Sequence, residues 1–230
     1  MYFLRFPIIF LIASLSLLNA SGEKHLFILA GQSNMAGLNP QVSFSPAVQM
    51  AFGKDAVIVI KDAQGGEPIR RWYKEWVPTP GAPLSTKGQG DLYDRLMKKV
   101  LPAVQGQELA SVTFVWMQGE RDAKESHGAV YGSSFLGLIE QLKKDLGRED
   151  IHFVIGRLSD MDMENTRYPH WTLVREEQVR VAEASDLGTW VDTDDLSMKK
   201  DNLHYDAEGY KELGQRFADK AIALIRSKNR

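Results

Sequence analysis

Short apolar runs alternate with amphipathic segments along most of this chain. Each apolar run is typical of a buried strand, and each amphipathic segment places its apolar residues at helical spacing. The apolar runs cover residues 25–30, 56–60, 111–117, 151–155 and 188–191, and the helical patterns cover residues 91–104, 130–146, 170–184 and 206–225. Because strands that alternate with helices form parallel sheets covered on both faces, we expect an α/β fold with a five-stranded parallel sheet.

Two stretches of the chain predict loops. Residues 39–52 are rich in Pro, Ser and Gln, and residues 68–90 contain Trp72, Trp76 and several prolines. A loop as long as the second one usually has a function in a compact domain. Its two tryptophans fit a wall on which a sugar ring stacks, and they fit equally a small core beneath the loop.

The first 22 residues have the pattern of a secretory signal peptide. Arg5 is followed by an apolar stretch over residues 6–18 and then by small residues, with cleavage expected after Ala20 or Gly22. An uncleaved anchor is the alternative, although the apolar stretch is short for a membrane span. We therefore expect a secreted or periplasmic protein without membrane contact after cleavage, in which residues 23–230 form a single domain.

Composition excludes several classes of protein. The 230 residues have a formal net charge of -2, with both signs spread along the chain, which argues against nucleic acid or an anionic membrane as a partner. The chain has no cysteine, so disulfides, thiol catalysis and cysteine-ligated metals are excluded. A domain of this length can bury a full core without such cross-links.

Residues suited to catalysis follow several of the predicted strands. Ser33 stands at the turn after the first strand, Gly65 and Gly66 follow the second, and Gln118 follows the third. In parallel sheets the carboxyl ends of the strands share one edge, and ligands bind there. We expect these residues to gather at that edge, together with residues 192–204 after the fifth strand.

Ser33, Asp201 and His204 are the residue types of a nucleophile, an orienting acid and a base. An acid three residues before His204 can hold one imidazole nitrogen while the other faces Ser33, so that the imidazole takes the serine proton and returns it to the leaving group. The alternative for Ser33 is that it only caps a helix.

Ester hydrolysis at Ser33 also requires donors for an oxyanion. The candidates are the backbone N–H of Ser33, a backbone N–H of Gly65 or Gly66, and the side-chain amide of Gln118. The alternative for Gln118 is a residue at the end of a strand that bonds only to neighbouring backbone.

Three motifs of this chain resemble the signatures of one branch of the SGNH hydrolases. They are GQSNM at residues 31–35, WMQGERD at residues 116–122 and DNLH at residues 201–204. The branch comprises the sialate O-acetylesterase-like and family 6 carbohydrate esterases. The resemblance implies a three-layer α/β/α flavodoxin-like fold and a serine acetylesterase that removes O-acetyl groups from carbohydrate without a metal or cofactor. It implies acetylated xylan-like polysaccharide or an O-acetyl sialic acid as the substrate.

The resemblance also assigns roles to individual residues. It makes Ser33 the nucleophile, His204 the base and Asp201 its partner, with Gly65 or Gly66 and Gln118 in the oxyanion hole. Residues expected to organise the site are Gln32, Asn34, Gly119 and Glu120; the last does so by hydrogen bonds or as a second acid partner of His204. Candidate substrate contacts are Arg121, Trp72 and Trp76.

Three other functions compete with this interpretation. A metal-dependent hydrolase would use the crowded acids Asp192, Asp194, Asp195 and Asp201 with His204, although no calcium-loop or paired-histidine pattern accompanies them. A carbohydrate-binding protein without catalysis would have no need of the serine, acid and histidine. A nucleotide- or flavin-binding protein is disfavoured because no glycine-rich phosphate loop follows the first strand.

Overall fold

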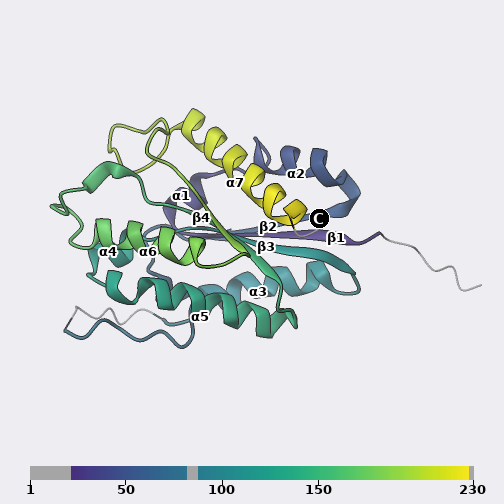
Figure 1. The fold of residues 1–230 in the computed structure, drawn as a ribbon, viewed down its shortest axis with the longest axis horizontal. Coiled ribbons are helices and arrows are strands. Elements are labelled where there is room, and N and C mark those ends of the chain that lie inside the picture. Colours follow the sequence, from purple (N-terminus) through teal and green to yellow (C-terminus); the bar gives the residue numbers. More distant parts are fainter. Residues whose placement is uncertain (1–21, 82–87, 228–230) are drawn as a thin grey trace, which may run out of the picture.

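A five-stranded parallel sheet forms the centre of the protein, as the sequence predicts. The computed structural model describes residues 22–81 and 88–227, and within these residues the strand order is β2-β1-β3-β4-β5 (Figure 1). The strands are β1 (Lys24–Gly31), β2 (Val57–Ala63), β3 (Leu109–Met117), β4 (Ile151–Gly156) and β5 (Gly188–Val191). All neighbouring strands pair in parallel, so their carboxyl ends meet at one edge.

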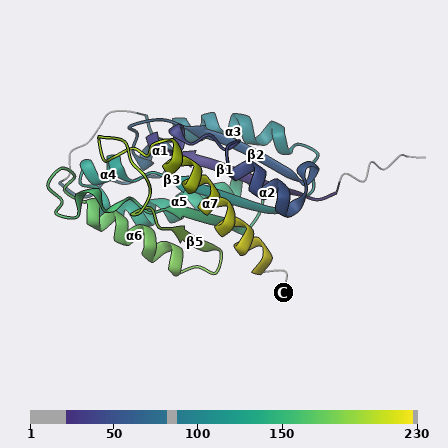
Figure 2. The same ribbon diagram turned by 90° about the horizontal axis from the view of Figure 1, so that it is seen from above.

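Helices cover both faces of this sheet, which gives three layers (Figures 1 and 2). One face carries α2 (Phe44–Phe52) and α7 (Ala207–Ser227), and the other carries α3 (Asp91–Val104), α5 (Gly128–Leu146) and α6 (Trp171–Glu183). Side chains of β1 alternate between the two cores: Phe27 packs with Phe44 and Phe217, whereas Ile28 belongs to the core of Phe114. Because both faces are buried, residues 26–30 of β1 are apolar without interruption.

Two short helices lie at the carboxyl edge of the sheet; the sequence predicts a helix that begins at Ser33 but not the one after β3. They are α1 (Ser33–Gly37), directly after β1, and α4 (Glu120–Lys124), directly after β3. The remaining single turns are η1 (Lys54–Ala56), η2 (Ile69–Arg71) and η3 (Asp160–Asp162). Helices of five residues are too short to produce an amphipathic pattern, and tertiary contacts decide whether they form.

The prediction of a loop over residues 39–52 is wrong for the last nine residues, which form α2. Phe44 and Val48 are fully buried at helical spacing, and Pro46 lies in the first turn. A proline is tolerated there because the N–H that it lacks would have no partner within the helix.

The two tryptophans of the long aromatic stretch belong to the core. Trp72 is fully buried and Trp76 is 7% exposed. The Trp72 ring lies edge-on to that of Trp116, with the centroids 5.2 Å apart. The prediction that Trp72 and Trp76 form a sugar-stacking wall is therefore wrong, and the alternative of a core beneath the loop is correct.

The predicted signal peptide lies outside the described residues except for Gly22. Among residues 22–81 and 88–227, no helix is both long and apolar enough to cross a bilayer.

Candidate active site

At the end of β1 the backbone lies very close to β3, and this close approach places Ser33 above the edge of the sheet. Gly31 has a φ of +144°, and a Cβ atom there would lie 2.0 Å from the carbonyl oxygen of Met117. Only glycine fits so close to the neighbouring strand. The next residue, Gln32, donates its N–H to the same carbonyl at 2.9 Å, and Ser33 then begins α1.

Ser33, His204 and Asp201 form a continuous hydrogen-bonded chain. The Oγ of Ser33 lies 3.0 Å from Nε2 of His204, and the Nδ1 of His204 lies 2.7 Å from Oδ2 of Asp201. The other carboxylate oxygen of Asp201 accepts the backbone N–H groups of Leu203 and His204, each at 3.0 Å. The hydrogen bond from the His204 ring and these backbone donors hold the pKa of Asp201 well below its usual value. This arrangement lets His204 act as a base towards Ser33.

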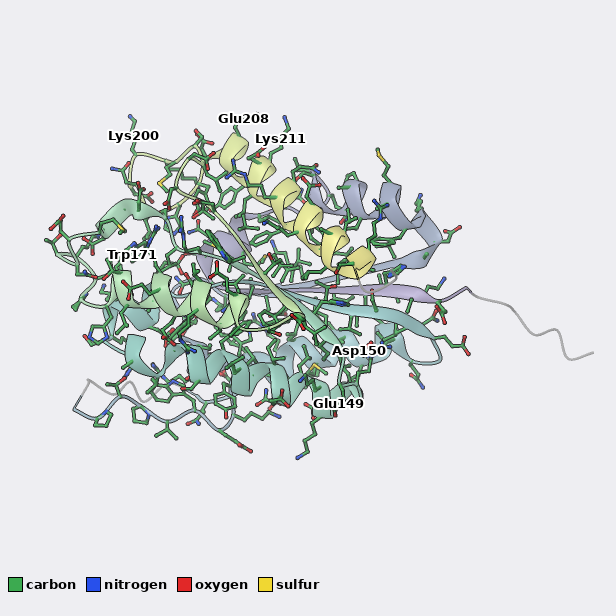
Figure 3. All side chains as sticks on the ribbon, viewed as in Figure 1. Glu149, Asp150, Trp171, Lys200, Glu208 and Lys211 are labelled. Atoms are coloured by element: carbon green, nitrogen blue, oxygen red, sulfur yellow. The ribbon has the colours of Figure 1, made fainter. Side chains whose placement is uncertain are left out.

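The loop that carries Asp201 and His204 is closed on itself. Met198 and Tyr205 form an antiparallel bridge, and the N–H of Lys199 donates to the carbonyl oxygen of His204 at 2.8 Å. The tip of the loop is exposed, and Lys200 extends from it away from the sheet (Figure 3).

Asn34 joins this loop to Ser33. Its side-chain amide donates to the carbonyl oxygen of Leu203 at 3.0 Å and to Oε1 of Glu120 at 3.1 Å. Its side-chain oxygen accepts the N–H of Tyr205 at 3.4 Å and the hydroxyl group of Tyr210 at 3.2 Å. All four bonds are made by a residue that is 2% exposed and adjacent in the chain to Ser33.

Glu120 bonds to Asn34, whereas His204 bonds to Asp201. The side chain of Glu120 is 2% exposed, and burial raises the pKa of its carboxyl group. The geometry therefore gives Glu120 the organising position, and Asp201 holds the position of acid partner to His204.

A cavity of about 330 Å³ opens at the Ser33 hydroxyl group. Its lining residues are Gln32, Ser33, Gly65, Gly66, Glu120, Arg121, Lys124, Tyr168, Leu203 and His204. Of these, Lys124, Tyr168 and Leu203 were not singled out from the sequence. Lys124 follows Glu120 by one helical turn, which is a usable signal once α4 is known, but nothing in the sequence indicates Tyr168.

The glycines after β2 lie beside Ser33. A Cβ atom on Gly65 would be 3.7 Å from the Cβ of Ser33, and Gly66 has a φ of +72°. Arg121 donates its Nε–H to the carbonyl oxygen of Gly66 at 2.7 Å. The backbone at Gly65 and Gly66 is thus placed where its N–H groups can approach an oxyanion on a substrate at Ser33.

The position of Gln118 corrects the prediction of a direct oxyanion donor. Its fully buried Nε2 lies 2.5 Å from Oδ2 of Asp122, 3.2 Å from the carbonyl oxygen of Glu67 and 3.3 Å from Oε1 of Gln32. Gln118 does not line the cavity, because these acceptors occupy both of its amide protons. Its amide holds neighbouring segments together instead.

Gln32 lines the cavity, whereas Gly119 lies outside it and sets the packing of α4. The side-chain oxygen of Gln32 also accepts the backbone N–H of Arg121 at 3.2 Å. Gly119 precedes α4 with a φ of +154°, and a Cβ atom there would lie 2.8 Å from Val174. A side chain at position 119 would therefore push α4 away from α6.

The acids that suggested a metal site are paired with arginines. Asp192 and Asp194 lie 2.6 and 2.7 Å from Arg157, and Asp195 lies 2.6 Å from Arg216. In the part of the chain that the structure describes, no three His, Asp or Glu side chains converge so as to hold a metal ion. The described acids thus give no support to the metal-dependent alternative.

Comparison with known proteins identifies relatives of this chain. The family model described as carbohydrate esterase, sialic acid-specific acetylesterase matches residues 37–223, a range that includes Asp201 and His204 and begins four residues after Ser33. The probable carbohydrate esterase At4g34215 of Arabidopsis thaliana is 26% identical over 184 residues, which cover 78% of this chain and 62% of that protein. The chain thus spans less than two thirds of the length of this relative.

Solved structures share the fold. The crystal structure of the Arabidopsis thaliana protein superposes with a TM-score of 0.69 at 21% identity, covering 88% of this chain and 99% of the other. The carbohydrate acetylesterase XAC1771 from Xanthomonas citri gives a TM-score of 0.59 at 17% identity over 88% of this chain and 57% of the other. The aryl esterase of M. smegmatis gives 0.58 at 13% identity over 87% and 99%. The α/β/α fold predicted from the resemblance is confirmed.

Proposed function

Because this chain belongs to the sialic acid-specific acetylesterase family of carbohydrate esterases, we propose that it removes O-acetyl groups from a sugar through an acetyl-enzyme on Ser33. The observation that carries the proposal is the chain of contacts from Asp201 through His204 to Ser33, at 2.7 and 3.0 Å, beside a cavity. Such a chain activates a serine hydroxyl group that is otherwise a weak nucleophile.

In the acylation step, the Oγ of Ser33 attacks the acetyl carbonyl carbon while its proton passes to Nε2 of His204. The carbonyl oxygen becomes an oxyanion that the backbone N–H groups at Ser33 and at Gly65 or Gly66 stabilise. The bond between the carbonyl carbon and the sugar oxygen then breaks. His204 gives its proton to that oxygen, the deacetylated sugar leaves, and the acetyl group stays on Ser33.

In the deacylation step, water replaces the sugar. His204 takes a proton from the water molecule while the water oxygen attacks the acetyl carbon. The bond between the acetyl carbon and Ser33 Oγ breaks, His204 returns its proton to that oxygen, and acetic acid leaves and ionises to acetate in water. Throughout both steps Asp201 remains ionised, fixes the tautomer of His204 and stabilises the imidazolium form.

Two cations at the mouth of the cavity favour a sugar that carries a carboxylate. Lys124 is exposed and, within the described residues, forms no ion pair. Arg121 has a third of its side chain exposed; besides its hydrogen bond to Gly66, it has a long ion-pair contact, 3.7 Å, with Glu125. An O-acetyl sialic acid offers the matching negative charge, so we place it ahead of neutral acetylated xylan. A secreted or periplasmic location, which the N-terminal sequence pattern favours, would bring the protein to such substrates.

The test is acetate release from an O-acetyl sialic acid, from acetylated xylan and from a simple aryl acetate, each with Ser33→Ala as the matched control. We expect release from the sialic acid ester that the Ser33→Ala variant lowers at least about 10³-fold. Release from xylan alone would support the proposed esterase activity and overturn the choice of an O-acetyl sialic acid as the substrate. Sugar binding without any serine-dependent release would favour a binding protein and refute the proposal.

A further inference from the structure

A second buried acid, besides Glu120, lies beside the site and takes no part in the proposed reaction. Asp122 lies in α4, is fully buried and does not line the cavity. Its Oδ2 accepts two hydrogen bonds, from the backbone N–H of Ile69 at 2.9 Å and from Nε2 of Gln118 at 2.5 Å. Its Oδ1 has no hydrogen-bond partner in the described part of the chain.

Both hydrogen bonds of Asp122 connect it to residues 65–69, here called the glycine segment, one directly and one through Gln118. Ile69 is the last residue of this segment, and the Gln118 amide that bonds to Asp122 also donates to the carbonyl oxygen of Glu67 at 3.2 Å. Arg121, which neighbours Asp122 in α4, holds a third point of the segment at the carbonyl oxygen of Gly66. One short helix thus fixes the backbone on which Gly65 faces Ser33.

An oxyanion hole stabilises a transition state only when its donors are held in place before the reaction begins. A displacement of about 1 Å in such a group can cost about 100-fold in rate. We propose that Asp122 is a positioning residue. Through Ile69 and Gln118 it holds the glycine segment beside Ser33, so that the backbone N–H groups of this segment lie where the oxyanion forms. This inference rests on the proposed function.

The surroundings indicate that Asp122 is needed as an acceptor rather than as a charge. Its charged and titratable neighbours are Arg70, which favours the anion, and Glu125 and Tyr131. Burial outweighs Arg70 and raises the pKa of Asp122 to about 7. A proton on the unpartnered Oδ1 leaves Oδ2 free to accept both hydrogen bonds. Asparagine can do the same with its single side-chain oxygen, whereas alanine cannot.

The experiment compares Asp122→Ala with Asp122→Asn on the ester that the unmodified protein cleaves best. We expect Asp122→Ala to lower kcat about 100-fold and to leave KM within about threefold, because the interaction acts only in the transition state. Asp122→Asn keeps the acceptor, so its kcat should return to within about tenfold of the unmodified protein. Leu142→Ala, at the far end of α5, serves as the control for lost stability, since it opens a core cavity away from the site.

Each outcome separates the inference from the proposed function. Equal kcat for Asp122→Ala and for Leu142→Ala variants of similar Tm would overturn the inference and leave the esterase intact. A rise in KM without a fall in kcat would overturn it as well, since Asp122 would then affect substrate binding. If the unmodified protein releases no acetate that depends on Ser33, the proposed function fails and the inference fails with it. If Asp122→Ala does not fold, a kcat for Asp122→Asn more than about 100-fold below the unmodified value overturns the inference.

Discussion

The Oγ of Ser33 lies 3.0 Å from Nε2 of His204, although 171 positions separate the two residues in the chain. Asn34 accounts for this closeness, because its side chain bonds to the backbone on both sides of His204, at Leu203 and Tyr205. The residue next to Ser33 therefore also sets the position of His204.

Asn34→Ala should separate Ser33 from His204. The change removes four hydrogen bonds in a buried position, so we expect kcat to fall about 10- to 100-fold and the free energy of unfolding to fall by about 1–3 kcal/mol. Steady-state kinetics and thermal unfolding measure the two effects. Asn39→Ala, at an exposed asparagine of the following loop, is the control. An Asn34→Ala variant with the kinetics of that control would contradict this account.

Asp201→Asn should lower kcat by about 10⁴-fold, because an amide next to Nδ1 favours the wrong tautomer of His204. The fold should persist, since Asp201 is exposed. A loss of less than about tenfold would mean that Glu120 can replace Asp201 as the acid partner. The double variant with Glu120→Gln would then show the large loss that the single variant lacks.

Alanine at the two glycines of the glycine segment should have different effects. At Gly66 a Cβ atom strains a left-handed backbone, so Gly66→Ala should lower the free energy of unfolding by about 1–2 kcal/mol. At Gly65 the added methyl group makes ordinary contact with Ser33 but projects beside the nucleophile, so Gly65→Ala should raise KM while Tm stays the same. Equal Tm values for the two variants would refute the predicted strain at Gly66.

Asp122 should make stability depend on pH near neutrality. Burial raises its pKa from the usual 3.8 to about 7, so between these values the folded protein holds a proton that the unfolded chain has lost. The contribution of Asp122 to stability is therefore lost as the pH rises through this window. Asp122→Asn keeps the acceptor without the ionisation, so its Tm relative to the unmodified protein should rise from pH 5 to pH 8. A constant difference would show that Asp122 ionises normally.

Lys124→Ala should raise KM for a sugar that carries a carboxylate and leave KM for a neutral ester unchanged. The effect should be about two- to fivefold at low ionic strength and smaller in salt, because the exposed ammonium group is screened. Lys98→Ala, on α3, provides a charge-matched control away from the cavity. Equal changes for charged and neutral esters would exclude a role for Lys124 in recognising charge.

The sequence predicts the sheet well because buried parallel strands are continuous apolar runs, and all five appear where such runs occur. Helix α2 escapes prediction because only Phe44 and Val48 mark its buried face, and its proline suggests a loop. The site is predictable where it depends on residues at the ends of strands, as with Ser33 and His204.

The site is less predictable where the direction of a side chain decides its role. Gln118 follows β3 as expected, yet its side-chain amide donates to the carboxylate of Asp122 and to the carbonyl oxygen of Glu67, so that it points away from the cavity. The burial of Trp72 depends on packing against Trp116, 44 positions later in the chain, which no local pattern indicates.

Ser33 follows the interior strand β1, whereas His204 comes after the edge strand β5. During synthesis at about 5–20 residues per second, roughly ten to thirty seconds separate the emergence of the two residues from the ribosome. Throughout that interval the serine has no base, and a serine hydroxyl group alone is a weak nucleophile. On the proposed mechanism the nascent chain is therefore unable to cleave esters until β5 and the loop after it have joined the sheet.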